Sequence, residues 1–131
     1  MNQDEKLKEK RFLMQILRNT QNDIIKWEKK SIESYNLSTG EHKFGSEFQT
    51  KLNERIMVIY NVESKYSMKI IVSSPEWVKE IRLGFIDPKG KLAYWEFSSL
   101  EYSIIRDIYN EIVRKESHID DFINQILGTN V

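Results

Sequence analysis

The hairpin predicted between residues 81 and 97 constrains the fold of this chain more than any other feature. Two runs of alternating apolar and polar residues flank Asp87–Gly90, whose sequence Asp-Pro-Lys-Gly is typical of a tight turn. If Asp87 faces Lys91 across that turn, one face of the hairpin holds Ile81, Leu83, Phe85, Ala93, Trp95 and Phe97. A register shifted by one residue would split this apolar set between core and solvent. The sequence therefore predicts an antiparallel hairpin with one buried face.

Further alternating segments extend this hairpin into a sheet. They cover residues 25–28, 48–52, 56–62 and 66–72. The segment Ile56–Val62 carries apolar residues on both faces, so we expect a strand that is central or covered on both sides. Residues 29–46 are rich in Ser, Asn and Gly and predict a flexible loop.

Three segments have helical periodicity. Residues 4–20 form an amphipathic pattern, and a broad apolar stripe follows residues 100–113, with Ser98 or Ser99 as its cap. A third pattern covers residues 119–127, which Ser117 would cap and Gly128 would end. We expect one α+β domain over residues 1–131, with an N-terminal helix, an antiparallel meander of five or six strands, and two C-terminal helices packed on one sheet face.

Composition narrows the classes of function. The 131 residues contain 20 basic and 20 acidic side chains, so the formal net charge is zero, which disfavours nucleic-acid binding and leaves it a weak alternative. Cysteine is absent, and the charged N-terminal residues do not resemble a signal peptide. We expect a cytoplasmic protein that has no membrane association. Zero net charge and exposed strand edges are also compatible with a homodimer.

Motifs for catalysis, metals and nucleotides are missing from the sequence. His42 and His118 have no partner at ligand spacing, so we expect no metal site. Phosphate-binding loops and nucleophile elbows are absent as well. We therefore expect no cofactor, no catalytic residue and no enzymatic activity.

One segment carries a resemblance. Residues 20–27, Thr-Gln-Asn-Asp-Ile-Ile-Lys-Trp, resemble the helix-to-strand junction Thr-x-Asn-Gly-x-Ile-x-Trp of small uncharacterised α+β proteins from Gram-positive bacteria, their prophages and mobile elements. Asp23 stands where that pattern has Gly. The resemblance implies the same outline of helix, strand meander and terminal helices, and it implies no activity.

The function that we expect is a protein–protein interaction module. The outer hairpin face mixes apolar and charged residues, as interfaces do, and the candidate partner-binding residues are Arg82, Ile86, Leu92, Tyr94 and Glu96. By analogy with the phage or mobile-element setting, the partner would be a larger host enzyme that this protein inhibits or neutralises. The alternative is a small-ligand pocket between sheet and helices, lined by Trp27, Trp77, Tyr94 or Trp95.

Overall fold

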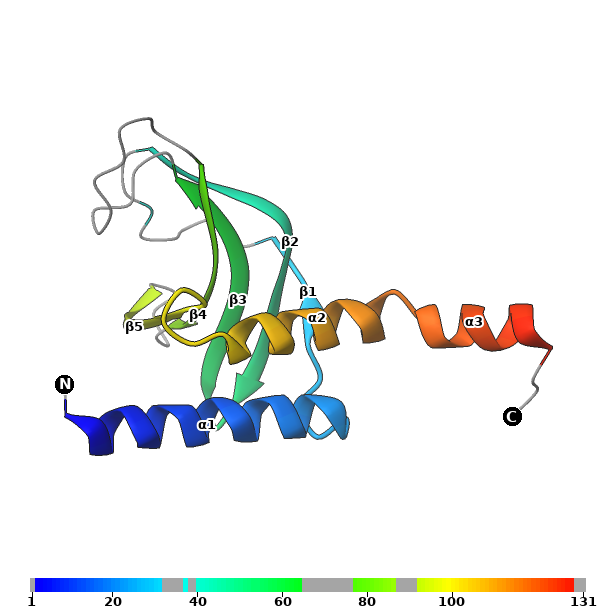
Figure 1. The fold of residues 1–131 in the computed structure, drawn as a ribbon, viewed down its shortest axis with the longest axis horizontal. Helices are drawn as coiled ribbons and strands as arrows, with labels where there is room; N and C mark the ends of the chain where they lie inside the picture. Colours follow the sequence, from blue (N-terminus) through cyan, green and yellow to red (C-terminus); the bar gives the residue numbers. More distant parts are fainter. Residues whose placement is uncertain (1, 32–36, 38–39, 65–76, 87–91, 129–131) are drawn as a thin grey trace.

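The computed structural model describes residues 2–31, 37, 40–64, 77–86 and 92–128, and for residues 92–94 it describes the backbone only. It confirms the α+β class, with an N-terminal helix, an antiparallel sheet in meander order β1-β2-β3-β4-β5, and two C-terminal helices (Figure 1). The elements are α1 (Gln3–Gln21), β1 (Glu28–Lys29), β2 (Glu41–Leu52), β3 (Arg55–Ser64), β4 (Val78–Ile86), β5 (Leu92–Ser98), α2 (Ile104–Glu116) and α3 (Ile119–Leu127).

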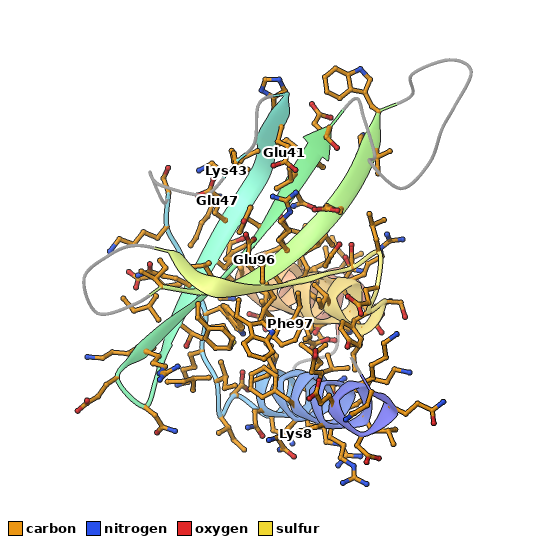
Figure 2. All side chains as sticks on the ribbon, turned by 90° about the vertical axis from the view of Figure 1, so that its left-hand side faces the viewer. Lys8, Glu41, Lys43, Glu47, Glu96 and Phe97 are labelled. Atoms are coloured by element: carbon orange, nitrogen blue, oxygen red, sulfur yellow. The ribbon has the colours of Figure 1, made fainter. Side chains whose placement is uncertain are left out.

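Helices α1 and α2 lie on the same face of the sheet, and the main core fills the space between these layers (Figure 1). Each helix turns its apolar stripe toward the strands, since burial removes that stripe from water. Figure 2 shows Phe97 in this layer, between the strands and α1. The fully buried members of the core are Leu13, Phe48, Met57, Ile59, Leu83, Ile105 and Ile108.

Strand β3 is buried on both faces, as its sequence predicts. Met57 and Ile59 point into the helix-covered core, whereas Val58, Tyr60 and Val62 form a second apolar cluster on the opposite face of the sheet. Ile86 and the partly buried Leu37 join this second cluster. We call this opposite side the outer face of the sheet.

The predicted register of the hairpin is correct near its turn and wrong farther along. Ile86 pairs with Leu92, as expected, but Leu83 pairs with Phe97 and Gly84 with Glu96, because an irregularity between Gly84 and Ile86 shifts the pairing by two residues. A shift by two returns each side chain to the same face. The turn itself, Asp87–Gly90, lies outside the described residues.

Two side chains of the hairpin differ from expectation. Trp95 was expected in the core but is 57% exposed, because it lies on the edge strand β5. Its ring contacts that of Phe97, with the two ring centroids 6.2 Å apart. Ile86 was expected to be exposed but retains only 8% of its accessible surface, because it packs in the second cluster.

Strand β1 begins later than predicted, and strand β2 begins earlier. The backbone N–H groups of Ile24 and Ile25 donate to Asn19 O, so these residues close the end of α1, and β1 starts only at Glu28. Strand β2 starts at Glu41, inside the predicted loop 29–46, because the long strand β3 offers ladder partners up to Ser64. The predicted strand 66–72 lies outside the described residues.

The C-terminal helices depart from the prediction in one important respect. Helix α2 begins at Ile104 rather than near residue 101, and it packs on the sheet. Helix α3 begins after His118, ends at Gly128 as predicted, and extends beyond the sheet along the direction of α2 (Figure 1). The prediction that both C-terminal helices cover the sheet is therefore right for α2 only.

Candidate functional site

Of the five residues predicted to bind a partner, the structure describes the side chains of Arg82, Ile86 and Glu96. Arg82 and Glu96 lie on the outer face of the sheet, as predicted, but both are partly buried, and Ile86 is buried beside them. Leu92 and Tyr94 belong to β5, and their side chains lie outside the described part of the structure. Arg82 and Glu96 therefore belong to a packed polar layer, and Ile86 belongs to the second apolar cluster, rather than to an exposed surface.

Arg82 is the centre of a charge network that joins strands β2 and β4. Its guanidinium donates hydrogen bonds to the carboxylates of Glu41 on β2 and Glu80 on its own strand, and the three side chains are only 15–16% exposed. Ser98 on β5 donates a further hydrogen bond of 3.2 Å to Glu80. Burial disfavours the charged form of the guanidinium and would lower its pKa. The hydrogen bonds and charges of the two carboxylates have the larger combined effect, so the pKa of Arg82 is raised.

A second buried pair lies next to this network. The Tyr60 hydroxyl on β3 donates a hydrogen bond to Glu96 Oε2 on β5, passing across the intervening strand β4. Gly84 lies between them, and a Cβ at this position would be 3.0 Å from Glu96 Cγ. The absence of a side chain at Gly84 thus lets Glu96 fold across β4 and reach Tyr60.

Burial sets the protonation of this pair. Desolvation raises the pKa of the Glu96 carboxyl, and the hydrogen bond from Tyr60 together with the charge of Arg82 offsets only part of that effect. Burial and the adjacent Glu96 also raise the pKa of the Tyr60 hydroxyl, so Tyr60 remains a donor at neutral pH. The buried polar side chains that the structure describes all have hydrogen-bond partners.

A further ion pair continues the polar layer along β2. Lys43 Nζ lies 2.8 Å from Glu47 Oε1, and Figure 2 shows both side chains on β2 with Glu41. The polar layer of the outer face therefore spans β2 to β5 through ion pairs and hydrogen bonds. The Arg82–Glu41 ion pair holds β4 and β2 in position relative to one another, because removing either side chain would leave a partly buried charge without its partner.

A pocket of about 370 Å³ opens on the other side of the molecule, between the ends of α1 and α2. Ile25 and Ile112 are buried and give it an apolar wall, while Lys115 and Asp23 form an ion pair of 2.9 Å at its rim. Trp27, predicted as a pocket wall, does line it. Trp77 and Trp95 are 51% and 57% exposed and lie elsewhere.

Exposed apolar side chains gather on α3. None of the nine residues of α3, all of which the structure describes, is buried. Its apolar side chains are 40–70% exposed and comprise Ile119, Phe122, Ile123, Ile126 and Leu127. We call these five residues the α3 apolar face.

Sequence reasoning found the apolar pattern of α3 but assigned it to the sheet. A signal for the observed outcome was present: α1 and the segment 104–113 already supply two apolar stripes, which are enough to cover one face of a small sheet. Ser117 and His118 then break the helix, and His118 adopts a left-handed backbone with φ of 54°. A third apolar stripe after such a break has no sheet surface left to cover.

Comparison of this chain with protein-family models, curated proteins and solved structures gave no significant match. In the described part of the chain, no helix is both long and apolar enough to cross a membrane. No group of three or more His, Asp or Glu side chains among the described residues is arranged to hold a metal ion.

Proposed function

We propose that this protein is a protein-binding module and that α3 is its binding element. The observation that carries the proposal is the α3 apolar face, whose five side chains are all exposed. Contiguous exposed apolar surface of this kind marks interaction sites, because its burial against a partner is favourable by about 25 cal/mol per Å². The binding residues of this proposal differ from the hairpin residues that the sequence suggested.

The spacing of the apolar side chains supports recognition of a helix in a groove. Ile119, Phe122, Ile123 and Ile126 occupy positions i, i+3, i+4 and i+7, which lie on one side of a helix. Helical peptides that dock into apolar grooves present their anchors at this spacing. Leu127 at i+8 lies on the same side, and the other four residues of α3 are polar, so the helix offers a single apolar face to a partner.

The junction between α2 and α3 holds this face away from the body of the protein. Arg114 on α2 donates to both carboxylate oxygens of Asp120 on α3, and Ser117 Oγ donates to Arg114 O at 2.9 Å. With His118 in a left-handed conformation, these contacts set the direction of α3. Preorganisation of this kind lowers the entropy cost of binding.

The test is a comparison of two variants that add the same charge to neighbouring positions. Ile126→Asp places a carboxylate in the α3 apolar face, and Gln125→Asp places one about 100° around the helix. Tagged wild type, Ile126→Asp and Gln125→Asp would be used to capture proteins from a bacterial lysate, with quantification by mass spectrometry. Proteins retained by wild type and Gln125→Asp but lost by Ile126→Asp support the proposal.

Two outcomes would contradict the proposal. The first is capture of the same proteins at the same level by all three baits. The second is a large loss of melting temperature in Ile126→Asp, which would show that Ile126 stabilises the fold. Since Ile126 is 70% exposed, we expect the Ile126→Asp variant to have the same melting temperature as the Gln125→Asp variant. The further expectation that the partner is a host enzyme stays a prediction.

The pocket beside Trp27 supports small-ligand binding as a second candidate function. Its volume of about 370 Å³ falls within the range of small-molecule sites, and its rim holds both signs of charge through Lys26, Lys115 and Glu116. A zwitterionic metabolite such as an amino acid would match that rim. Isothermal titration calorimetry of wild type and Lys26→Ala with a panel of amino acids would test this candidate. Binding heat that wild type gives and the variant lacks would support the site. Absence of binding heat in wild type would reject it.

A further inference from the structure

We infer that the partner of α3 is a second copy of this chain, and that α3 of one copy docks along the outer side of α1 of the other. This inference rests on the proposed function and adds the identity of the partner. Four observations carry it: an exposed groove on α1, its unpaired cations, the opposite charge of α3, and the matching spacing of apolar side chains.

The groove follows the side of α1 that faces away from the core. It has a volume of about 430 Å³ and is lined by Leu7, Lys10, Arg11, Met14, Gln15 and Arg18. Leu7 is 53% exposed and Met14 42% exposed, so the apolar part of the groove lining is open to water. The opposite side of α1 carries Leu13 and Ile16, which are buried in the core.

The apolar side chains of the groove and of α3 match along the helix axis. Leu7 and Met14 are seven residues apart, as are Ile119 and Ile126. Seven residues span two turns of a helix, or about 10.5 Å along the axis. Two α-helices that pack side by side can therefore bring both pairs into contact at once.

The charges of the two helices are opposite. The groove has three cations, Lys10, Arg11 and Arg18, and none of them is ion-paired within the described residues. Helix α3 contains two acidic residues and no basic residue. Asp120, which also pairs with Arg114, flanks the α3 apolar face, whereas Asp121 lies on the far side of the helix. The formal net charge of zero also leaves self-association unopposed by repulsion between copies.

The position of α3 favours docking on another copy over docking on its own α1. Figure 1 shows α3 extending beyond the sheet, past the C-terminal end of α1. The left-handed backbone at His118 directs it that way, and the exposed Arg114–Asp120 ion pair bridges the junction. In a two-fold dimer each copy would donate its α3 and receive that of its partner, which doubles the contact.

The experiment is sedimentation equilibrium over a wide range of protein concentration, with three variants. Ile126→Asp disables α3, Met14→Glu disables the groove, and Gln125→Asp is the matched control. We expect Gln125→Asp to self-associate at least as strongly as wild type, because its added carboxylate also faces a cationic partner, and each of the other two variants to weaken association at least tenfold. All three positions are exposed, and circular dichroism would verify that each variant is folded.

Mixing the two defective variants gives the sharper result. Ile126→Asp keeps an intact groove and Met14→Glu keeps an intact α3, so a mixture restores one α3–groove contact. We expect the mixture to associate more strongly than either variant alone. This complementation would not occur if the two substitutions merely damaged separate folds.

Three results would overturn the inference. Wild type could remain monomeric at every concentration, Met14→Glu could associate as wild type does, or the mixture could show no gain. If wild type is monomeric while α3-dependent capture of other proteins persists, the second-copy inference fails and the proposed function stands. If capture and self-association are both insensitive to Ile126→Asp, the proposed function fails as well.

Discussion

The indole Nε1 of Trp27 donates a hydrogen bond of 3.1 Å to Thr20 Oγ1, which in turn donates to Ile16 O at 2.8 Å. This chain of two hydrogen bonds ties the last turn of α1 to the segment that leads into β1. Thr20 is almost fully buried, and Ile25 between the two residues is also buried. The junction therefore fixes the direction in which the chain leaves α1 and enters the sheet.

Thr20→Val keeps the shape of the side chain and removes this hydroxyl. We expect the free energy of unfolding to fall by about 1–2 kcal/mol, because the partly buried Trp27 Nε1 loses its acceptor. Chemical denaturation would measure the change. In a Trp27→Phe background the same substitution should cost clearly less, and an equal cost in both backgrounds would show that the Thr20–Trp27 hydrogen bond contributes nothing.

Asp23 occupies a backbone conformation that glycine prefers, with φ of 60°. We expect Asp23→Gly to be more stable than Asp23→Ala by about 1 kcal/mol, because both lose the exposed ion pair with Lys115 but only Gly relieves the left-handed conformation. Thermal and chemical unfolding of the two variants would test this. Equal stabilities would mean that the backbone at residue 23 relaxes without cost.

The residues of this junction show what the sequence could establish. The pattern at residues 20–27 marks a helix-to-strand junction, and the structure gives Thr20, Asp23, Ile25 and Trp27 distinct roles in it. Positive φ at Asp23 is the physical reason why Gly would suit that position. Membership of the family that this pattern resembles stays a prediction.

Sequence periodicity also predicted the class of fold and the faces of the strands, because the two-residue period of a strand is local. It could not predict the register of β4 against β5, since the two-residue shift preserves the face of each side chain and leaves the alternation unchanged. The network around Arg82 joins Glu41, 41 positions away in the chain, and no local pattern reports such a contact. The exposure of α3 depends on how much sheet surface remains, which is likewise a tertiary property.

The raised pKa of Glu96 predicts a pH-dependent contribution to stability. In the unfolded chain the Glu96 carboxyl loses its proton near its ordinary pKa of 4.5, whereas in the folded protein it keeps the proton to higher pH. Protonation of Glu96 therefore favours the folded state at low pH, and this contribution is lost as the pH rises through the folded-state pKa. Glu96→Gln cannot titrate but retains an oxygen that can accept from Tyr60.

We accordingly expect the stability of Glu96→Gln relative to wild type to increase as the pH rises from about 4 to 8. Unfolding by urea at a series of pH values would measure this difference. A difference that is constant over this range would show that the pKa of Glu96 is the same in the folded and unfolded states.

Gly84 is expected to be essential for the Tyr60–Glu96 hydrogen bond. Its backbone does not adopt a positive φ, so alanine is unstrained there, but the added Cβ would lie 3.0 Å from Glu96 Cγ and 3.5 Å from Trp95 O. Gly84→Ala should therefore displace Glu96 from Tyr60 and lower the free energy of unfolding by about 1–2 kcal/mol. In a Glu96→Ala background Cγ is absent, and the same substitution should be neutral or stabilise by up to about 1 kcal/mol through the unfolded state. Chemical denaturation of the four proteins of this double-mutant cycle measures the coupling, and an equal loss in both backgrounds would locate the conflict at the β5 backbone instead of at Glu96.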